Sequence, residues 1–565
     1  MKSLRLLKRT LNKFNESSKS NIFLRNHSAW TQDGIIKTPY EDIKEIPNIT
    51  LYDYVWQNLD KWPERTASIC SVTGRGYTYE QAFKLSNAFA ANLRKKLKIR
   101  DGDSIAVMLP NVPDFPLVAM GILEAGGIIT TINPIYTAHE VQRQLLMSEA
   151  KVVITLPNIV GVIKEAFDIA KINLPIIAVK VNGETTPNGT IAFNELSEDV
   201  HVDKSCLKEV RRTVNDLCFL PYSSGTTGLP KGVELTNKNI ISNCEQMNEP
   251  DIKCHSETTA THQDAVLAIL PFFHIYSASV IMFHKMAQGI KLVTMPKLQP
   301  DEFMQALEKF KINVLFCAPP LIFLMASHPL ASKEVYRYLE MVINGAAPIS
   351  SSDADRFMDK VQRKIRFGQG YGLTETSPVV CMAPKDCEDY SVVGPALPST
   401  QLKIVDSELK PLGPNQLGEL LIRGPQVMKG YKDNPEANDA TFADDWFRSG
   451  DVASSDAKGY IKIVDRIKEL IKVKGFQVPP AELEAVLREH PSIKDAAVIG
   501  VPHPTKGETP KAFVVIDREA KVDVKEICDY VNKRVAPYKQ VNDVVFLDSI
   551  PKTASGKILR KDLKA

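Results

Sequence analysis

Short apolar runs that alternate with helical segments from about residue 52 to residue 500 constrain the fold of this chain most. The runs that predict buried strands are Ile105–Leu109, Gly127–Thr131, Val152–Thr155, Ala265–Leu270, Lys291–Met295, Val314–Cys317 and Met341–Asn344. Tyr79–Lys96 and Asp301–Lys309 have the spacing of helices. Strands that alternate with helices are typical of largely parallel sheets. We therefore predict a large α/β domain with parallel-rich sheets flanked by helices.

The pattern changes after about residue 400, where short strands and tight turns replace the alternation. Strands are predicted at Gln401–Val405, Glu419–Arg423 and Tyr460–Val464, which indicates a small β-barrel-like subdomain. A charged and apolar run then ends at Gly475, and the elements predicted after it are the helix Pro480–His490, the strands Ala496–Val501 and Ala512–Ile516, and the helix Val524–Arg534.

The 565 residues exceed what one hydrophobic core usually organises. We place the domain boundary at Lys468, which gives a large domain over residues 29–467 and a smaller, mobile α+β domain over residues 468–565.

The charge balance and the cysteine spacing indicate which classes of protein the chain does not resemble. Lysine plus arginine number 70 and aspartate plus glutamate 67, a net charge of +3, which argues against a protein that coats nucleic acid. The nine cysteines form no CxxC pair, so we expect reduced, mostly buried thiols.

The long apolar stretches Ala265–Phe283 and Val314–Ala331 are interrupted by Pro271 and by Pro319 and Pro320. We expect each to be a buried strand followed by a buried helix, with no transmembrane segment.

The first 28 residues differ from the rest of the chain. Leu4, Leu7, Leu11 and Phe14 repeat at helical spacing among lysines and arginines, a pattern typical of a mitochondrial transit peptide. A basic tail without function is the alternative, and would leave the protein in the cytoplasm. The chain ends in Leu563-Lys564-Ala565 and lacks the Ser-Lys-Leu peroxisomal signal.

The strongest motif is the loop from Tyr222 to Gly232. Its glycines let backbone N–H groups turn inward, while hydroxyls and one lysine surround them, an arrangement that suits the phosphates of a nucleotide. No Gly-Lys-Ser/Thr triplet closes the loop, so it is not a Walker A motif. The candidate nucleotide-binding residues are Ser223, Ser224, Gly225, Thr226, Thr227, Gly228 and Lys231.

With this loop, the chain resembles the AMP-forming adenylating superfamily, which includes acyl-CoA synthetases, peptide-synthetase adenylation domains and firefly luciferase. It looks most like the branch of 4-coumarate–CoA ligase and luciferase, over residues 50–562. The resemblance implies that the chain activates a small-molecule carboxylic acid with ATP and Mg²⁺ and transfers the acyl group to coenzyme A.

A second motif, Gly368–Thr376, follows the family pattern for the nucleotide. The resemblance implies that Tyr371 stacks on adenine, that Thr374 contacts the α-phosphate and that Glu375 holds Mg²⁺. A carboxylate suits this hard cation. The other residues that the resemblance places at the nucleotide are Gln369, Gly370 and Gly372 in this motif, and Gly345, Ala346 and Ala347 beside the adenine.

Further motifs match the family's ribose site and hinge. Asp451 matches the aspartate that accepts the ribose hydroxyls, and Arg466 matches the family's arginine that also contacts the ribose. Lys468 matches the hinge on which the small domain turns. The residues that match the contacts presented in the CoA-using conformation are Lys472, Lys474, Gly475 and Gln477.

The run Pro551–Lys557 matches the motif of the family's C-terminal catalytic lysine, which is Lys557 here. His274 matches a residue that gates the acyl tunnel beside the carboxylate. The substrate-pocket candidates are His274, Ile275, Tyr276, Ser277, Pro378 and Val379, and the segment Ala318–Leu321 resembles tunnel wall.

The resemblance implies two steps in one site, separated by a rotation about Lys468 that exchanges Lys557 for Lys472. Three alternatives remain at this point: an adenylation enzyme that loads a carrier protein, a luciferase-like oxygenase, and a nucleotide sensor without activity. The predicted tunnel mixes aromatic and aliphatic residues, which suits an aryl-propenoate or a medium-chain fatty acid. The sequence leaves the oligomeric state open.

Overall fold

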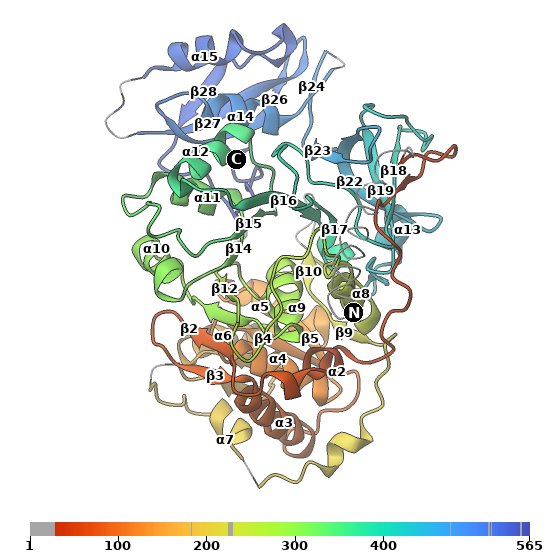
Figure 1. Cartoon of the computed structure of the whole chain (residues 1–565), viewed down its shortest axis with the longest axis vertical. Coiled ribbons are helices and arrows are strands. Elements are labelled where there is room, and N and C mark those ends of the chain that lie inside the picture. Colours follow the sequence, from red (N-terminus) through yellow and green to blue (C-terminus); the bar gives the residue numbers. More distant parts are fainter. Residues whose placement is uncertain are drawn as a thin grey trace, which may run out of the picture.

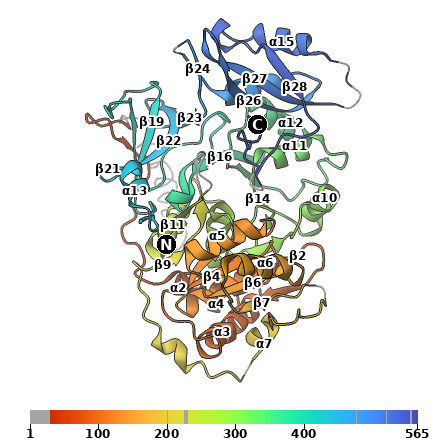
Figure 2. The ribbon, with the colours of Figure 1, turned by 180° about the vertical axis from the view of Figure 1, so that it is seen from behind.

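The structure is a computed structural model that describes residues 29–181, 183–199, 201–223, 230–474, 476–517, 520, 522–553 and 556–564. These residues form sheets of nine, eight, six and five strands. Figures 1 and 2 show the two largest sheets with their helices in the body of the molecule, the six-stranded sheet at its side and the five-stranded sheet at one end. The predicted fold class, a large α/β domain with a smaller α+β domain, is confirmed.

The nine-stranded sheet has a parallel centre that runs in the order β9-β5-β4-β6-β7-β8. Its strands are β4 (Ser104–Met108), β5 (Ile128–Thr131), β6 (Val152–Thr155), β7 (Ile176–Ala178), β8 (Ile191–Ala192), β9 (Leu217–Phe219), β10 (Tyr222–Ser223), β11 (Lys231–Thr236) and β20 (Gly430–Tyr431). The helices beside it in the chain are α2 (Leu51–Trp56), α3 (Tyr79–Lys95), α4 (Phe115–Glu124), α5 (Ala138–Ser148), α6 (Val160–Ala170), α7 (Phe193–Ser197) and α8 (Asn237–Gln246). At one edge of this sheet the strands are antiparallel: β11 pairs with β9 and with β10. The Ser/Thr/Gly loop lies between β10 and β11 at this edge.

The eight-stranded sheet is parallel from β2 to β16, with an antiparallel strand at each edge. Its strands are β2 (Thr66–Cys70), β3 (Gly76–Thr78), β12 (Ala265–Ala268), β13 (Lys291–Thr294), β14 (Val314–Cys317), β15 (Met341–Asn344), β16 (Arg366–Gly372) and β17 (Val379–Met382). The helices between them are α9 (His284–Ala287), α10 (Pro300–Lys309), α11 (Pro319–Ser327) and α12 (Ser351–Val361). The carboxyl ends of β15 and β16 lead into the predicted adenine and Thr-Glu segments, as expected for ligand sites of parallel sheets.

The subdomain predicted as small and β-barrel-like is an antiparallel sheet of six strands. It contains β1 (Ile36–Lys37), β18 (Gln401–Val405), β19 (Gly418–Arg423), β21 (Phe442–Ala443), β22 (Trp446–Ser455) and β23 (Ile461–Arg466), with α13 (Pro435–Thr441) beside them.

The five-stranded sheet has its own hydrophobic core, which includes Val498 and Val514. The elements of this unit are β24 (Ile471–Val473), β25 (Phe476–Val478), β26 (Ile493–His503), β27 (Gly507–Ile516), β28 (Asp543–Phe546), α14 (Pro480–Arg488) and α15 (Val524–Asn532). The proposed boundary at Lys468 falls in the turn between β23, which pairs with β22, and β24, which belongs to this last sheet. The chain thus passes from one sheet to another within this short segment, and the hinge role of Lys468 stays a prediction.

Local signals explain where several elements begin and end. Thr78 caps α3 through a capping box with Gln81. The stretch from Ala265 forms β12 and then a π-helix, Tyr276–Phe283, that continues as α9. No helix in the described part of the chain is long and apolar enough to cross a membrane. All nine cysteines are free thiols, and most are buried.

Candidate active site

A β-hairpin brings the two ends of the Ser/Thr/Gly loop together. Ser223 on β10 pairs with Lys231 on β11. The hydroxyl of Ser223 is buried, and no residue in the described ranges offers it a hydrogen-bond partner. Because an unsatisfied buried hydroxyl is costly, this atom suits a polar ligand. Ser224, Gly225, Thr226, Thr227 and Gly228 lie outside the described residues.

Lys231 lies beside an aromatic ring and an acid. Its Nζ is 3.9 Å from the centre of the Tyr431 ring. The hydroxyl of Tyr431 donates to Oε1 of Glu375 at 2.9 Å. Burial lowers the pKa of Lys231, the charge of Lys468 lowers it further, and Glu375 opposes the shift. The structure thus brings the predicted residues Lys231 and Glu375 to the same tyrosine. Tyr431 was not predicted, because no motif marks it; it arrives there because β20 pairs with β11.

Glu375 is suited to a cation that comes with a nucleotide. Its side chain is largely buried, and Tyr431 occupies only one of its carboxylate oxygens. The described residues contain no group of three or more His, Cys, Asp or Glu side chains that could hold a metal by themselves. Mg²⁺ commonly takes one or two protein carboxylates and completes its shell with phosphates and water. This single carboxylate therefore fits Mg²⁺ carried by ATP.

The predicted ribose residues form a compact polar cluster. The register of β22 and β23 sets Asp451 opposite Arg466. Arg466 Nε lies 2.7 Å from Asp451 Oδ1, and the hydroxyl of Tyr371 donates to Asp451 Oδ2 at 2.5 Å. Each carboxylate oxygen has a second lone pair, so Asp451 can still accept hydrogen bonds from ribose hydroxyls.

Burial governs the protonation of this cluster. It raises the pKa of Asp451, and the charge of Arg466 and the Tyr371 hydrogen bond oppose that rise. Burial and the nearby Asp451 raise the pKa of Tyr371 well above its ordinary value. Tyr371 therefore remains a hydrogen-bond donor, a role in addition to the predicted stacking on adenine.

The adenine-flanking segment follows β15 directly. A Cβ on Gly345 would lie 2.9 Å from the ring of Tyr276, so a side chain there would displace that ring. Ala346 has a φ of +68°, uncommon for a residue with a side chain. Gln369 Oε1 accepts hydrogen bonds from Asn344 Nδ2 at 3.0 Å and from the backbone N–H of Ile349 at 3.2 Å. Gln369 therefore shapes this segment through its amide oxygen.

Two motif residues flank this segment on β16, Gly370 and Gly372, and Thr374 begins the short helix that contains Glu375. The second motif thus begins on β16 and continues into the turn and the short helix that follow its carboxyl end.

Lys557 reaches the same site from the end of the chain. Gly556, with a φ of +84°, packs so closely on the start of α11 that a Cβ would lie 3.0 Å from Pro320 Cδ. Burial lowers the pKa of Lys557, the charge of Arg466 lowers it further, and Glu469 and Asp451 oppose the shift. A residue of the small domain thus shares its electrostatic environment with the ribose cluster of the large domain.

His274 is uncharged at neutral pH. Burial, and then the charge of Lys557, lower its pKa to about 4. The backbone N–H of Tyr276 donates to His274 Nδ1 at 3.3 Å, which assigns the ring proton to Nε2. The imidazole can therefore donate a hydrogen bond to a carboxylate.

The other predicted pocket residues differ in exposure. Tyr276 is partly exposed, and its hydroxyl donates to the Ile343 carbonyl at 3.3 Å. Ile275 is buried, and the Ser277 hydroxyl donates to the Leu270 carbonyl at 2.6 Å. Pro378 and Val379 are also buried. The role of these residues in a substrate pocket stays a prediction.

The predicted CoA-step residues are not at this site. Lys472, Lys474 and Gln477 are exposed on the hairpin of β24 and β25. The backbone N–H groups of Lys472 and Lys474 donate to Glu508 and Lys506 of the same domain. Figure 1 shows β24 at the outer edge of the small domain. Gly475 lies outside the described residues. The structure brings Lys557, and not Lys472, to the predicted nucleotide residues.

Comparison with known proteins identifies the family. Residues 55–432 match the AMP-binding enzyme family, and residues 482–557 match the AMP-binding enzyme C-terminal domain. The chain belongs to the AMP-binding enzyme family. It is 37% identical over 544 residues to 4-coumarate–CoA ligase 1 of Petroselinum crispum, covering 94% of this chain and 97% of that one. It is 35% identical over 562 residues to 4-coumarate–CoA ligase 1 of Arabidopsis thaliana, covering 97% and 98%. The chain is therefore an adenylate-forming ligase.

Solved structures of similar proteins share this fold. ATP-bound MatB from Rhodopseudomonas palustris matches with a TM-score of 0.80 at 26% identity, covering 92% of this chain and 98% of that one. The apo form of MatB matches with a TM-score of 0.71 over the same shares of the two chains, 92% and 98%. The arrangement of this AMP-binding enzyme is thus more similar to the nucleotide-bound form of MatB.

Proposed function

We propose that this enzyme activates a small-molecule carboxylic acid with ATP and transfers the acyl group to coenzyme A, releasing AMP and pyrophosphate. The observation that carries the proposal is the position of Lys557. Its charge lowers the pKa of His274 and of Asp451, and the charge of Arg466 lowers the pKa of Lys557 itself. The relatives named as 4-coumarate–CoA ligases support this reaction.

In the first step a carboxylate oxygen attacks the α-phosphorus of ATP, and the bond to pyrophosphate breaks. Lys557 offsets the charge that develops between the carboxylate and the α-phosphate, and Nε2–H of His274 holds the carboxylate. Lys231 and the loop at 223–231 hold the leaving pyrophosphate. These groups act through position and electrostatics, without a protein nucleophile. Glu375 would hold Mg²⁺, which supplies charge neutralisation on the phosphates when bound.

In the second step the thiol of coenzyme A attacks the acyl carbon, and AMP leaves. The small domain first turns about Lys468, so that Lys557 departs and Lys472 and Lys474 arrive. A rotation of this kind lets one site serve both steps. The exposed position of Lys472 in the present arrangement supports a role confined to the second one.

We propose an aryl-propenoate as the acyl substrate, with a medium-chain fatty acid as the alternative. The ring of Tyr276, against Gly345 and 6.4 Å from the centre of the Phe316 ring, supports a flat aromatic acid. The test is a panel of both classes of acid, assayed for ATP–pyrophosphate exchange and for thioester formation with ATP, Mg²⁺ and coenzyme A. Exchange without thioester would favour carrier-protein loading, and absence of both with every acid would overturn the proposal.

A further inference from the structure

Helix α14 of the small domain is fastened to the large domain at both of its ends. At its first turn, the backbone N–H of Ala481 donates to Oδ2 of Asp465 at 3.0 Å. At its last residue, Arg488 Nε lies 3.4 Å from Oδ2 of Asp353. Asp465 belongs to β23 and Asp353 to α12, both in the large domain. Carboxylates from one domain therefore bind both ends of one helix of the other.

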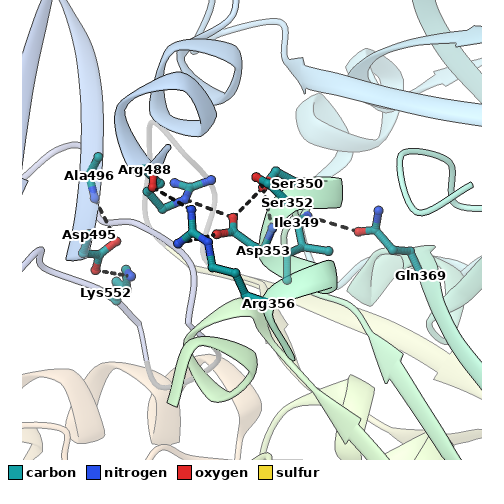
Figure 3. A network of polar contacts seen from close by, with 10 residues as sticks. All are labelled: Ile349, Ser350, Ser352, Asp353, Arg356, Gln369, Arg488, Asp495, Ala496 and Lys552. Atoms are coloured by element: carbon teal, nitrogen blue, oxygen red, sulfur yellow. Dashed lines mark hydrogen bonds and ion pairs between the residues drawn. The ribbon is translucent and has the colours of Figure 1, made fainter. Parts of the chain in front are cut away.

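The contact at Asp353 is reciprocal (Figure 3). Asp353 is 2% exposed, and Ser350, the residue that caps α12, donates to its Oδ2 at 2.7 Å. Arg356, one turn along α12, lies 3.6 Å from Asp353 Oδ1 and donates to the backbone carbonyl of Arg488 at 3.0 Å. Each domain thus offers an arginine to an acceptor of the other domain.

Electrostatics favour this arrangement on both sides. Asp353 lies in the first turn of α12, where the helix dipole stabilises an anion, and Arg488 ends α14, where the dipole stabilises a cation. Arg488 also lies 5.6 Å from the ring of Phe323 on α11. A carboxylate as buried as Asp353 is costly unless it is paired. Arg488 is the partner of Asp353 that α14 supplies, so this pair links the two domains only in an arrangement that keeps α14 in place.

Ion pairs connect α14 with the segment that carries Lys557. Glu484 of α14 forms an ion pair of 3.0 Å with Arg560, which also lies 3.2 Å from Glu469 beside the hinge. Arg560 follows Lys557 by three residues. On the large-domain side, Ile349 precedes the cap of α12 and donates to Gln369 at the adenine segment.

We propose that Asp353 and Arg488 are positioning residues for the first half-reaction, because they hold α14, and through it Lys557, in the adenylate-forming arrangement. The inference rests on the proposed function. It assigns these residues control over the balance between the two steps: the pair favours adenylation and must break before thioester formation.

The test measures the half-reactions separately in Arg488→Gln and Asp353→Asn. Pyrophosphate exchange should fall roughly three- to tenfold in each variant, the range expected for one partly buried ion pair. Thioester formation from supplied acyl-adenylate and coenzyme A should stay unchanged or become faster. The double variant should be no slower in exchange than the slower single one, because both changes remove one interaction. Arg488→Lys should restore part of the exchange.

Arg534→Gln is the matched control. Its guanidinium lies 3.6 Å from the Tyr530 ring within the small domain, so its removal should alter neither rate. Thermal melts should show all variants folded, and Asp353→Asn serves as the test if Arg488→Gln does not fold. Equal loss of both half-reactions, or unchanged exchange in a folded variant, would overturn the positioning role. A wild-type enzyme without pyrophosphate exchange for any acid would instead overturn the proposed function, and the inference with it.

Discussion

Lys285 is a buried cation that the proposed chemistry does not use, and replacing it should stabilise the protein. Its side chain is fully buried in α9, its Nζ lies 3.1 Å from Nδ1 of His255, and the Phe316 ring centre is 5.3 Å away. Burial lowers the pKa of Lys285 to about 8, from an ordinary value of 10.5. The folded protein therefore binds this proton less tightly than the unfolded chain does, so its stability rises with pH above about pH 8.

Lowering this pKa from 10.5 to about 8 reduces the free energy of unfolding by about 3 kcal/mol at pH values where Lys285 is protonated in the folded protein. The hydrogen bond to His255 returns about 1 kcal/mol. Lys285→Met keeps the length of the side chain without its charge. We expect it to be more stable than the wild type by about 1–2 kcal/mol near pH 7, and this advantage to shrink by about 1 kcal/mol by pH 9.

Urea unfolding at about pH 7, 8 and 9 measures this difference, with the exposed Lys462→Met as the control. Buried thiols such as Cys317 also affect stability at alkaline pH, but both proteins carry them, so they cancel in the comparison. A difference between wild type and Lys285→Met that stays constant with pH would refute the reasoning, as would a less stable variant at pH 7.

Four further outcomes test the proposed mechanism. Lys557→Ala should lower ATP–pyrophosphate exchange at least about 100-fold, as expected for a lost charge contact at the transition state, and spare thioester formation from supplied acyl-adenylate; near-normal exchange would remove Lys557 from the first step. Lys468→Pro should keep part of the exchange and lose thioester formation, because proline restricts the torsions of a hinge; equal loss of both with an unchanged melt would contradict rotation there. Glu375→Gln should raise the Mg²⁺ concentration that half-saturates exchange, and an unchanged titration would exclude Glu375 as the ligand. Residues 1–28, which lie outside the described residues, should direct a fluorescent fusion to mitochondria, and a diffuse signal would favour the basic tail.

The sequence by itself determined the strands of the parallel sheets and the motifs on them. Val314–Cys317 and Met341–Asn344 are strands with the predicted bounds, because fully buried parallel strands are short continuous apolar runs that sequence displays directly. The phosphate loop was predicted from its residue types and spacing, and Asp451 and Lys557 from the resemblance to the family, so their roles stay predictions that the experiments above test.

Tertiary structure decided which of these residues meet. The predicted strand Tyr460–Val464 in fact begins at Ile461 and continues to Arg466, and this extension sets Arg466 opposite Asp451. Tyr431 reaches Glu375 only through strand pairing, and Arg488 reaches Asp353 only because two domains touch. These contacts join residues far apart in the chain, so their energies depend on burial and on register. A local sequence pattern predicts neither burial nor register, because both arise only when separate elements have packed together.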